Sequence, residues 1–241
     1  MIDRLLELVF PENIYCMCCG AIIDRSRSYA LCDSCMEHFH WQTGKTCHIC
    51  GKRLQETFPG EICYSCMEND HYFDRAFSCV TYGLYERGLV MDFKYGDSPY
   101  IGRKIAEMMI DRMENEAIEY DYVTPVPIHE NRKRKRGYNQ AEIIAKEFAK
   151  LSGTKYNQCV RRIRDTIPMK GLSSHERFPN VDGAFQVAGD VSGKRILLID
   201  DIYTTGATLD AISKALKDEG AEAVYGLCFA AGANRRPDEE E

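Results

Sequence analysis

The residues best suited to chemistry lie between positions 195 and 220. Asp200 and Asp201 follow the apolar run 196–199, and a hydroxyl-rich loop comes next; it consists of Thr204, Thr205, Gly206, Ala207 and Thr208. Hydroxyl and backbone N–H groups at the start of a helix bind phosphate well, because the helix dipole adds positive charge there. Carboxylates accept the protons of sugar hydroxyls. This segment predicts a site for a phosphorylated sugar, and the missing Gly-Lys-Ser/Thr excludes the P-loop of nucleotide hydrolases.

A strand, a loop and a helix must position these groups. Residues 196–199 are wholly apolar, which is typical of a strand buried on both faces of a parallel sheet. Leu209, Ile212 and Leu216 recur at helical spacing, and Gly220 is placed to end that helix. We expect the strand to end just before Asp200. The plainer alternative is that the Asp and Thr residues merely cap the following helix.

Cysteines form a second group with chemical potential, because thiolates bind metal ions. Eight of the twelve cysteines form four Cys-x-x-Cys pairs, and the last two pairs repeat the first two at an offset of 31 residues. Gly20 and Gly51 directly follow the first pair of each copy. This spacing predicts two zinc-ribbon-like units with one ion each. The predicted ligands are Cys16, Cys19, Cys32 and Cys35 in the first copy and Cys47, Cys50, Cys63 and Cys66 in the second.

The two predicted Zn²⁺ ions are structural, because four thiolates leave no coordination position for water. Pairing within each copy follows from the identical spacing, while a crossed pairing of the first pair with the third is also geometrically possible. Residues 1–70 carry six Lys/Arg and ten Asp/Glu, and each Zn(Cys)4 centre adds about two negative charges. Such a module is a poor phosphate binder, so we expect a lid or docking surface that needs metal to fold.

Composition indicates a globular protein of the cytoplasm. The 241 residues are 44% hydrophobic and 28% charged, with a formal net charge of −6. Charged residues interrupt positions 1–12, so no signal-peptide core is expected, and no apolar stretch approaches the ~20 residues of a membrane span. In a cytoplasmic chain, clustered cysteines point to metal binding rather than to disulfides.

Strands and helices alternate after residue 70. Besides the central unit, strands are expected at residues 76–82, 122–126, 159–160, 185–187 and 223–230, and helices at residues 84–93, from Ser98 onward and at residues 139–151. A flexible loop is expected at residues 165–183. Alternation of this kind predicts a doubly wound α/β domain with a parallel sheet and ligands at the carboxyl ends of its strands. We expect a zinc module at 1–70, this domain at 71–234 and a disordered tail at 235–241.

Positive charge is concentrated in the middle of the chain. Residues 128–177 contain thirteen Lys/Arg and five Asp/Glu, a net charge of +8, and the run 132–136 is entirely basic. A solvated surface would explain the run alone. Its place directly after a strand end favours contact with a polyanion, either a pyrophosphate or a nucleic-acid backbone.

Residues 197–208 resemble the signature of the type I phosphoribosyltransferases, which bind phosphoribosyl pyrophosphate (PRPP). With the cysteine module, several further stretches resemble the ComF family, whose phosphoribosyltransferase-like members carry an N-terminal zinc module and are linked to competence for DNA uptake. These stretches are residues 126–129, 136–141 and 164–166, Leu172, Arg177, Asn180 and residues 183–185. Met169 stands where the family pattern leads us to expect glutamine.

The resemblance implies a role for each matching position. Asp200 and Asp201 would hold the ribose hydroxyls and act on the developing charge, while residues 204–208 would cradle the 5′-phosphate. Mg²⁺ would be carried mainly by the oxygens of PRPP. The implied pyrophosphate loop is Val126, Pro127 and Ile128, and the candidate cationic clamps are Arg161, Arg162, Lys170 and Arg177.

Two function classes remain open from the sequence. The first is an enzyme that transfers phosphoribose from PRPP to an acceptor that the sequence does not identify. The second is a binding protein of the same fold that handles single-stranded DNA with DNA-uptake proteins. The intact Asp-Asp and Thr-Thr-Gly-x-Thr positions favour a working PRPP site, and the lack of a base-recognition element keeps the second class open.

Overall fold

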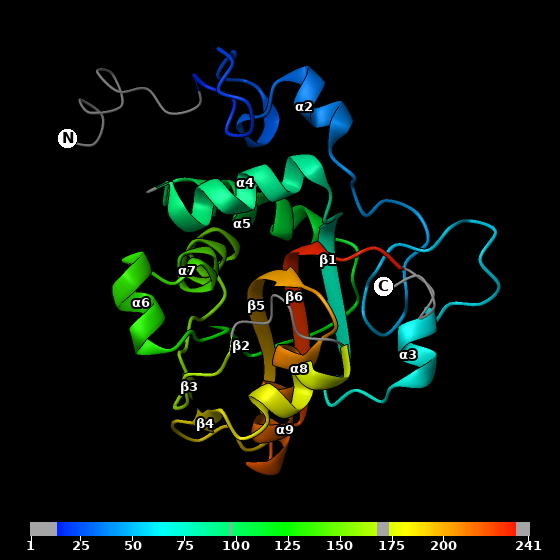
Figure 1. Cartoon of the computed structure of the whole chain (residues 1–241), viewed down its shortest axis with the longest axis vertical. Helices are drawn as coiled ribbons and strands as arrows, with labels where there is room; N and C mark the ends of the chain where they lie inside the picture. Colours follow the sequence, from blue (N-terminus) through cyan, green and yellow to red (C-terminus); the bar gives the residue numbers. More distant parts are fainter. Residues whose placement is uncertain (1–13, 97, 168–173, 235–241) are drawn as a thin grey trace.

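A four-stranded, wholly parallel sheet forms the centre of the molecule (Figure 1). The structure is a computed structural model, and it describes residues 14–96, 98–167 and 174–234. The strands are β1 (Arg75–Thr81), β2 (Tyr122–Pro125), β5 (Arg195–Tyr203) and β6 (Ala223–Ala231), in the order β1-β6-β5-β2. The predicted parallel α/β fold is confirmed. The predicted tail at 235–241 lies outside the described residues.

Helices cover both faces of the sheet. One face carries α4 (Leu84–Tyr95), α5 (Ile101–Met113) and α7 (Gln140–Ser152), and the other carries α9 (Ala207–Asp218). Side chains of β5 alternate between the two cores: Ile196 and Leu198 face α9, while Leu197 and Ile199 face α5 and α7. This strict alternation fixes which way the polar residues at the end of β5 can point.

The strand β5 is longer than predicted. We expected it to end before Asp200, but it continues to Tyr203 because β6 extends beside it, with Ile202 opposite Ala230 and Tyr203 opposite Ala231. Both carboxylates are therefore strand residues rather than the first residues of a loop.

The middle of the chain also departs from the prediction. The strands β3 (Val160–Arg162) and β4 (Phe185–Val187) form a separate antiparallel pair instead of joining the main sheet. The basic run forms a helix, α6 (Glu130–Arg136), and another helix, α8 (Ser174–Val181), lies inside the segment expected to be a flexible loop.

The two cysteine-rich units have the same backbone plan but different neighbours. Equivalent hydrogen bonds recur at the predicted offset: Cys32 N–H donates to Cys16 Sγ and Cys63 N–H to Cys47 Sγ, both at 3.3 Å. The first ribbon, with η1 (Ser28–Ala30) and α2 (Asp33–His38), shares the core of α4 and α5. The second, with α3 (Tyr64–Glu68), shares the core of α9, and Figure 1 shows the two units on separate sides of the molecule.

The segment between the ribbons covers the open edge of β1. Thr81 N–H donates to His40 O at 2.7 Å, and Gln42 N–H donates to Cys79 O at 2.8 Å. The buried Glu86 on α4 accepts a hydrogen bond from His40 N–H at 2.7 Å and so fixes this segment to the helix. Unpaired edge groups of the sheet are thus capped by the chain itself. Within the described residues, no helix is long and apolar enough to cross a membrane.

Candidate functional site

The loop between β5 and α9 turns sharply at a glycine. Gly206 has φ of +88°, and a Cβ placed there would lie 2.5 Å from Tyr203 Oη. A residue with a side chain would be strained in this backbone region and would also clash. The turn opens a hollow at the carboxyl edge of the sheet, and it is lined by Asp200, Ile202, Tyr203, Thr204, Thr205, Gly206, Ala207, Thr208 and Leu209.

Several hydrogen-bond donors of the hollow have no acceptor in the part of the protein that the structure describes. Asp210 N–H makes the first helical bond of α9, to Gly206 O at 2.8 Å, so the N–H groups before it are free for a ligand. Thr205 Oγ1 is buried and has no hydrogen-bond partner among the described residues. Buried polar atoms are normally paired, so an unpaired hydroxyl beside free N–H groups fits an anion, as the predicted phosphate cradle requires.

Asp200 and Asp201 point to opposite faces of the sheet. The alternation of β5 places Asp200 on the α9 side, where it lines the hollow, and Asp201 on the side of α4. Asp201 forms an ion pair with Lys94 near the end of α4, and both side chains are largely buried. Asp201 N–H donates to Asp200 Oδ1 at 2.8 Å. The two predicted catalytic residues are neighbours, but only Asp200 lines the hollow.

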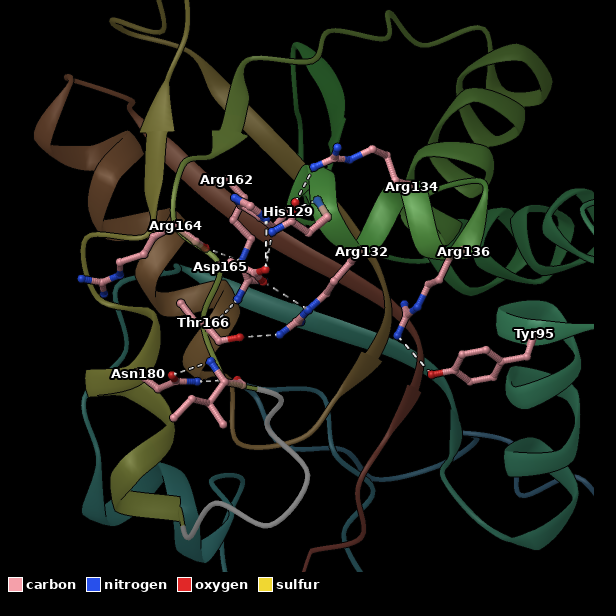
Figure 2. A network of polar contacts seen from close by, with 12 residues as sticks. Tyr95, His129, Arg132, Arg134, Arg136, Arg162, Arg164, Asp165, Thr166 and Asn180 are labelled. Atoms are coloured by element: carbon pink, nitrogen blue, oxygen red, sulfur yellow. Dashed lines mark hydrogen bonds and ion pairs between the residues drawn. The ribbon is translucent and has the colours of Figure 1, made fainter.

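Lys94 is a site residue that the sequence reasoning missed. Phe93 O, directly before it, accepts hydrogen bonds from Tyr138 Oη at 2.5 Å and Gln140 Nε2 at 3.3 Å. Arg136 donates to Tyr95 Oη at 3.3 Å, directly after it (Figure 2). The motif at residues 136–141 thus holds the end of α4 from both sides of Lys94. A single lysine near the end of a helix carries no signal of its own, so only the contact with Asp201 reveals it.

Burial raises the pKa of the Asp200 carboxyl well above its ordinary value, and the neighbouring Asp201 carboxylate adds to the increase. In an unfolded chain this group titrates near ~3.9. Between that pH and the higher pKa of the folded state, the unfolded chain has released the proton while the folded chain still holds it. The folded state is therefore disfavoured progressively as pH rises through this interval.

Replacing Asp200 with asparagine is expected to stabilise the protein at neutral pH, since the amide avoids the cost of the buried charge. The gain in melting temperature should be largest near pH 7 to 8 and should shrink towards pH 4. Thermal unfolding of both proteins across this range measures the difference. A gain that is constant with pH, or largest in acid, would contradict this account of Asp200.

The predicted pyrophosphate loop lies beside the end of β5. Val126 N–H donates to Ile199 O at 2.9 Å, which brings the loop next to Asp200. Val126 and Pro127 are buried, and Ile128 is half-buried. The buried Asn139 donates from Nδ2 to Val126 O at 3.0 Å. This bond fixes the turn by which the chain leaves β2. These two hydrogen bonds hold the start of the loop beside the strand that carries Asp200.

A polar network joins α6 to the chain that follows β3 (Figure 2). Arg132 donates to Thr166 O at 2.7 Å, and Asn131 Nδ2 donates to Asp165 Oδ2 at 2.8 Å. Arg162 donates to the Thr166 hydroxyl. Asn180 on α8 binds both the N–H and the carbonyl of Ile167. Two cations of the predicted basic segment, Arg132 and Arg162, are therefore engaged in holding Thr166.

The candidate clamps do not all converge on the hollow. Burial, with the charge of Arg132, lowers the pKa of the Arg162 guanidinium to about 10, while the Asp165 and Asp200 carboxylates oppose this change. Arg162 is thus close enough to Asp200 for the two charges to interact. Arg161 is exposed on the opposite side of β3, and Arg177 lies on α8. Lys170 and Met169 lie outside the described residues.

The cysteines gather in the tandem arrangement, and the crossed pairing is excluded. One cluster contains Cys16, Cys19, Cys32 and Cys35, and the other contains Cys47, Cys50, Cys63 and Cys66, with all sulfurs of a cluster within 4.8 Å of one another. Tetrahedral zinc places its sulfurs about 3.8 Å apart, because each Zn–S bond is about 2.3 Å long. Both donor sets fit structural zinc. Cys19 is exposed, whereas the second cluster is wholly buried.

Two known protein families match different parts of the chain. A double zinc ribbon domain matches residues 5–67, and a phosphoribosyl transferase domain matches residues 94–241. The predicted PRPP signature lies inside the second match.

Curated relatives include competence and DNA utilization proteins. Competence protein F of Haemophilus influenzae is 32% identical over 59% of this chain and 67% of its own length. Competence protein ComFC of Streptococcus pneumoniae is 29% identical, over 60% and 62% of the two chains. The DNA utilization protein YhgH of Salmonella typhi is 31% identical, over 45% and 48%. The chain thus spans about half to two thirds of the length of these relatives.

Solved structures similar to this one include the glutamine PRPP amidotransferase from B. subtilis complexed with ADP and GMP. It shares 22% identity with this chain and gives a TM-score of 0.39, over 57% of this chain and 30% of its own.

Proposed function

Because the chain belongs to the ComF family, with a phosphoribosyltransferase-like domain behind a double zinc ribbon, we propose that it binds PRPP and transfers the phosphoribosyl group to an acceptor. In this proposal the activity serves the handling of DNA taken up by the cell. The unpaired Thr205 hydroxyl beside free N–H groups is the observation that carries the proposal.

Each part of the hollow has a task in this reaction. The 5′-phosphate binds the loop at residues 204–208, and Asp200 accepts a ribose hydroxyl. The bond from C1 to the pyrophosphate oxygen breaks as a nucleophile attacks C1, and positive charge develops on the sugar. Asp200 stabilises that charge, and Arg162 offsets the charge of the departing pyrophosphate, while Lys94 neutralises Asp201 on the opposite face of the sheet. A Mg²⁺ ion held by PRPP oxygens would neutralise the same leaving group.

Titration calorimetry of the full chain tests this proposal directly. PRPP with Mg²⁺ is expected to bind more tightly than ribose 5-phosphate, and ribose 5-phosphate more tightly than inorganic phosphate, because each adds contacts to the same cradle. AMP is a further probe for a bound base. Failure of every phosphorylated sugar to bind would overturn the proposal.

A second candidate function is the binding of single-stranded DNA through α6. Arg134 and Lys135 are exposed on this helix, directly beyond the carboxyl end of β2, whereas Arg132 and Lys133 are engaged by Asp165 and Glu142. Arg134 donates to Asn131 Oδ1 at 2.5 Å, but both side chains stay exposed, and exposed cations on a short helix favour contact with a phosphate backbone.

Replacing Arg134 and Lys135 with alanine is expected to flatten the salt dependence of oligonucleotide affinity. Each lost phosphate contact reduces the slope of log K against log salt by about 0.7 for single strands, so the expected change is about 1.4. Fluorescence anisotropy at several salt concentrations measures this slope. The matched control replaces Arg25 and Arg53, two exposed arginines of the ribbons, with alanine. A slope that falls in the control but not in the α6 variant would place DNA on the ribbons instead.

A further inference from the structure

His71 lies between the second cysteine cluster and the helix α9. This helix begins in the loop at residues 204–208, the phosphate loop. Its Nε2 is 3.3 Å from Cys66 Sγ, and its Nδ1 is 2.8 Å from Asp210 Oδ2. The His71 side chain is only 4% exposed, and its ring stacks on Phe73 with centroids 4.5 Å apart. One buried imidazole therefore contacts a predicted zinc ligand on one side and α9 on the other.

Asp210 connects His71 to the phosphate loop. Tyr72 N–H donates to its second carboxylate oxygen at 2.8 Å, so residues 71 and 72 hold both oxygens. Its own N–H donates to Gly206 O at 2.8 Å, one turn earlier. A buried carboxylate is costly unless it is hydrogen-bonded, so the position of Asp210 depends on the contacts made by His71 and Tyr72, directly after the second ribbon.

Tyr203 provides a second connection on the other side of the loop. Its ring meets Phe73 edge to face at 6.2 Å, and the ammonium group of Lys52 in the second ribbon lies 5.7 Å from its centroid. The same ring occupies the space against Gly206. Both the residue that ends β5 and the first turn of α9 thus rest on the second ribbon.

The first ribbon makes no comparable contact with this loop among the described residues. It packs in the core of α4 and α5, and its Tyr29 hydroxyl donates to Asp111 on α5. The second ribbon instead shares one core with Tyr203, Leu209 and Ile212. Of two repeats with the same arrangement of cysteines, therefore, only the second packs, within the described part of the chain, against the residues that flank the phosphate loop.

We propose that the second cysteine cluster, acting through His71 and Asp210, sets the position of the phosphate loop, and that the first cluster has no part in this. His71 and Asp210 are positioning residues. Groups that hydrogen-bond to metal ligands orient those ligands and strengthen metal binding. The inference rests on the proposed phosphate site and assigns its support to one of the two ribbons.

Thermodynamic linkage makes the proposal testable on the unaltered protein. If zinc in the second cluster favours the ligand-binding form of the loop, the ligand must tighten that zinc by the same factor, about 5- to 150-fold for couplings of this type. Zinc release to a chromogenic chelator is therefore measured with and without PRPP or ribose 5-phosphate. We expect two ions per chain, of which the ligand protects one. Protection of neither ion, or of both equally, would overturn the inference.

Variants then identify the connecting residues. His71→Phe keeps the aromatic stack but loses both polar contacts. It should therefore lower the affinity for ribose 5-phosphate about 5-fold or more and abolish the protection of zinc by that ligand. Asp210→Asn should act in the same direction. His38→Phe in the first ribbon is the matched control, because this exposed histidine contacts Ser34 O within its own unit.

Outcomes of the two experiments separate the proposals. If the wild type binds the sugar phosphate and His71→Phe binds it equally well with two ions bound, the inference is wrong and the proposed function stands. If the wild type binds neither PRPP nor ribose 5-phosphate, the proposed function falls, and the inference falls with it. Circular dichroism and zinc content establish that each variant is folded.

Discussion

Replacing Thr205 with aspartate is expected to abolish the binding of PRPP and inorganic phosphate alike. The new carboxylate would occupy the anion cradle, where the buried Thr205 hydroxyl is now unpaired. Two like charges about 4 Å apart repel by about 4 kcal/mol at an effective dielectric constant near 20, which corresponds to about a thousandfold loss of affinity. Titration calorimetry with the two ligands measures the loss.

Two comparisons make this result specific. Thr43→Asp adds the same charge at an exposed position of the inter-ribbon segment and should leave binding unchanged. The double variant Asp200→Asn with Asp201→Asn should retain phosphate, because the cradle is intact, but lose most of its affinity for PRPP. Undiminished PRPP binding by both Thr205→Asp and the double variant would show that this loop is not the site, and the DNA-binding alternative would then be preferred.

Gly51→Ala is expected to destabilise the protein far more than Gly20→Ala, although the two glycines occupy equivalent places. Both have positive φ, +69° at Gly51 and +73° at Gly20, which costs alanine about 1–2 kcal/mol. A Cβ on Gly51 would also lie 2.5 Å from Ala76 O and 2.9 Å from Phe77 Cα, whereas nothing lies within 4 Å of one on Gly20. Backbone on β1 cannot move aside cheaply, so about 1–3 kcal/mol is added at Gly51 alone.

Thermal unfolding of the two variants checks this difference. In a chain of this size 1 kcal/mol corresponds to about 2–4 °C, so Gly51→Ala should melt roughly 5–15 °C below the wild type. Zinc content shows whether the second ribbon remains loaded. Equal losses of stability in the two variants would mean that the first knuckle of the second ribbon does not rest on β1 as described.

Features set by local spacing could be predicted from the sequence. The offset of 31 residues placed all eight ligands in their clusters, because each zinc ribbon is built from two short knuckles whose geometry is local. The alternation of strands and helices predicted the parallel sheet, which the structure confirms. The assignment of residues 204–208 as a phosphate loop, made from their glycine and hydroxyl groups, stays a prediction. Roles assigned to individual residues of that loop remain predictions.

Features that depend on contacts between distant residues could not be predicted. The end of β5 is set by its pairing with β6, and Lys94 becomes a site residue only because Asp201 lies opposite it. His71 and Asp210 are 139 residues apart, and neither has a local signal. The basic run was identified by charge, but charge alone could not show that Arg132 holds Thr166 or that the run is helical.

The second ribbon is synthesised long before the surfaces that cover it. Leu54 and Phe58 share a core with Ile212 on α9, which leaves the ribosome on the order of ten seconds later, at about 5–20 residues per second. During that interval the metal can organise the cysteines while the apolar face of the ribbon is still open. We expect the helix α9 to pack last, on a ribbon that already holds its metal. Without zinc during synthesis, the apolar faces of the second ribbon and of α9 would therefore stay exposed. The expected product is an aggregation-prone chain rather than a folded metal-free protein.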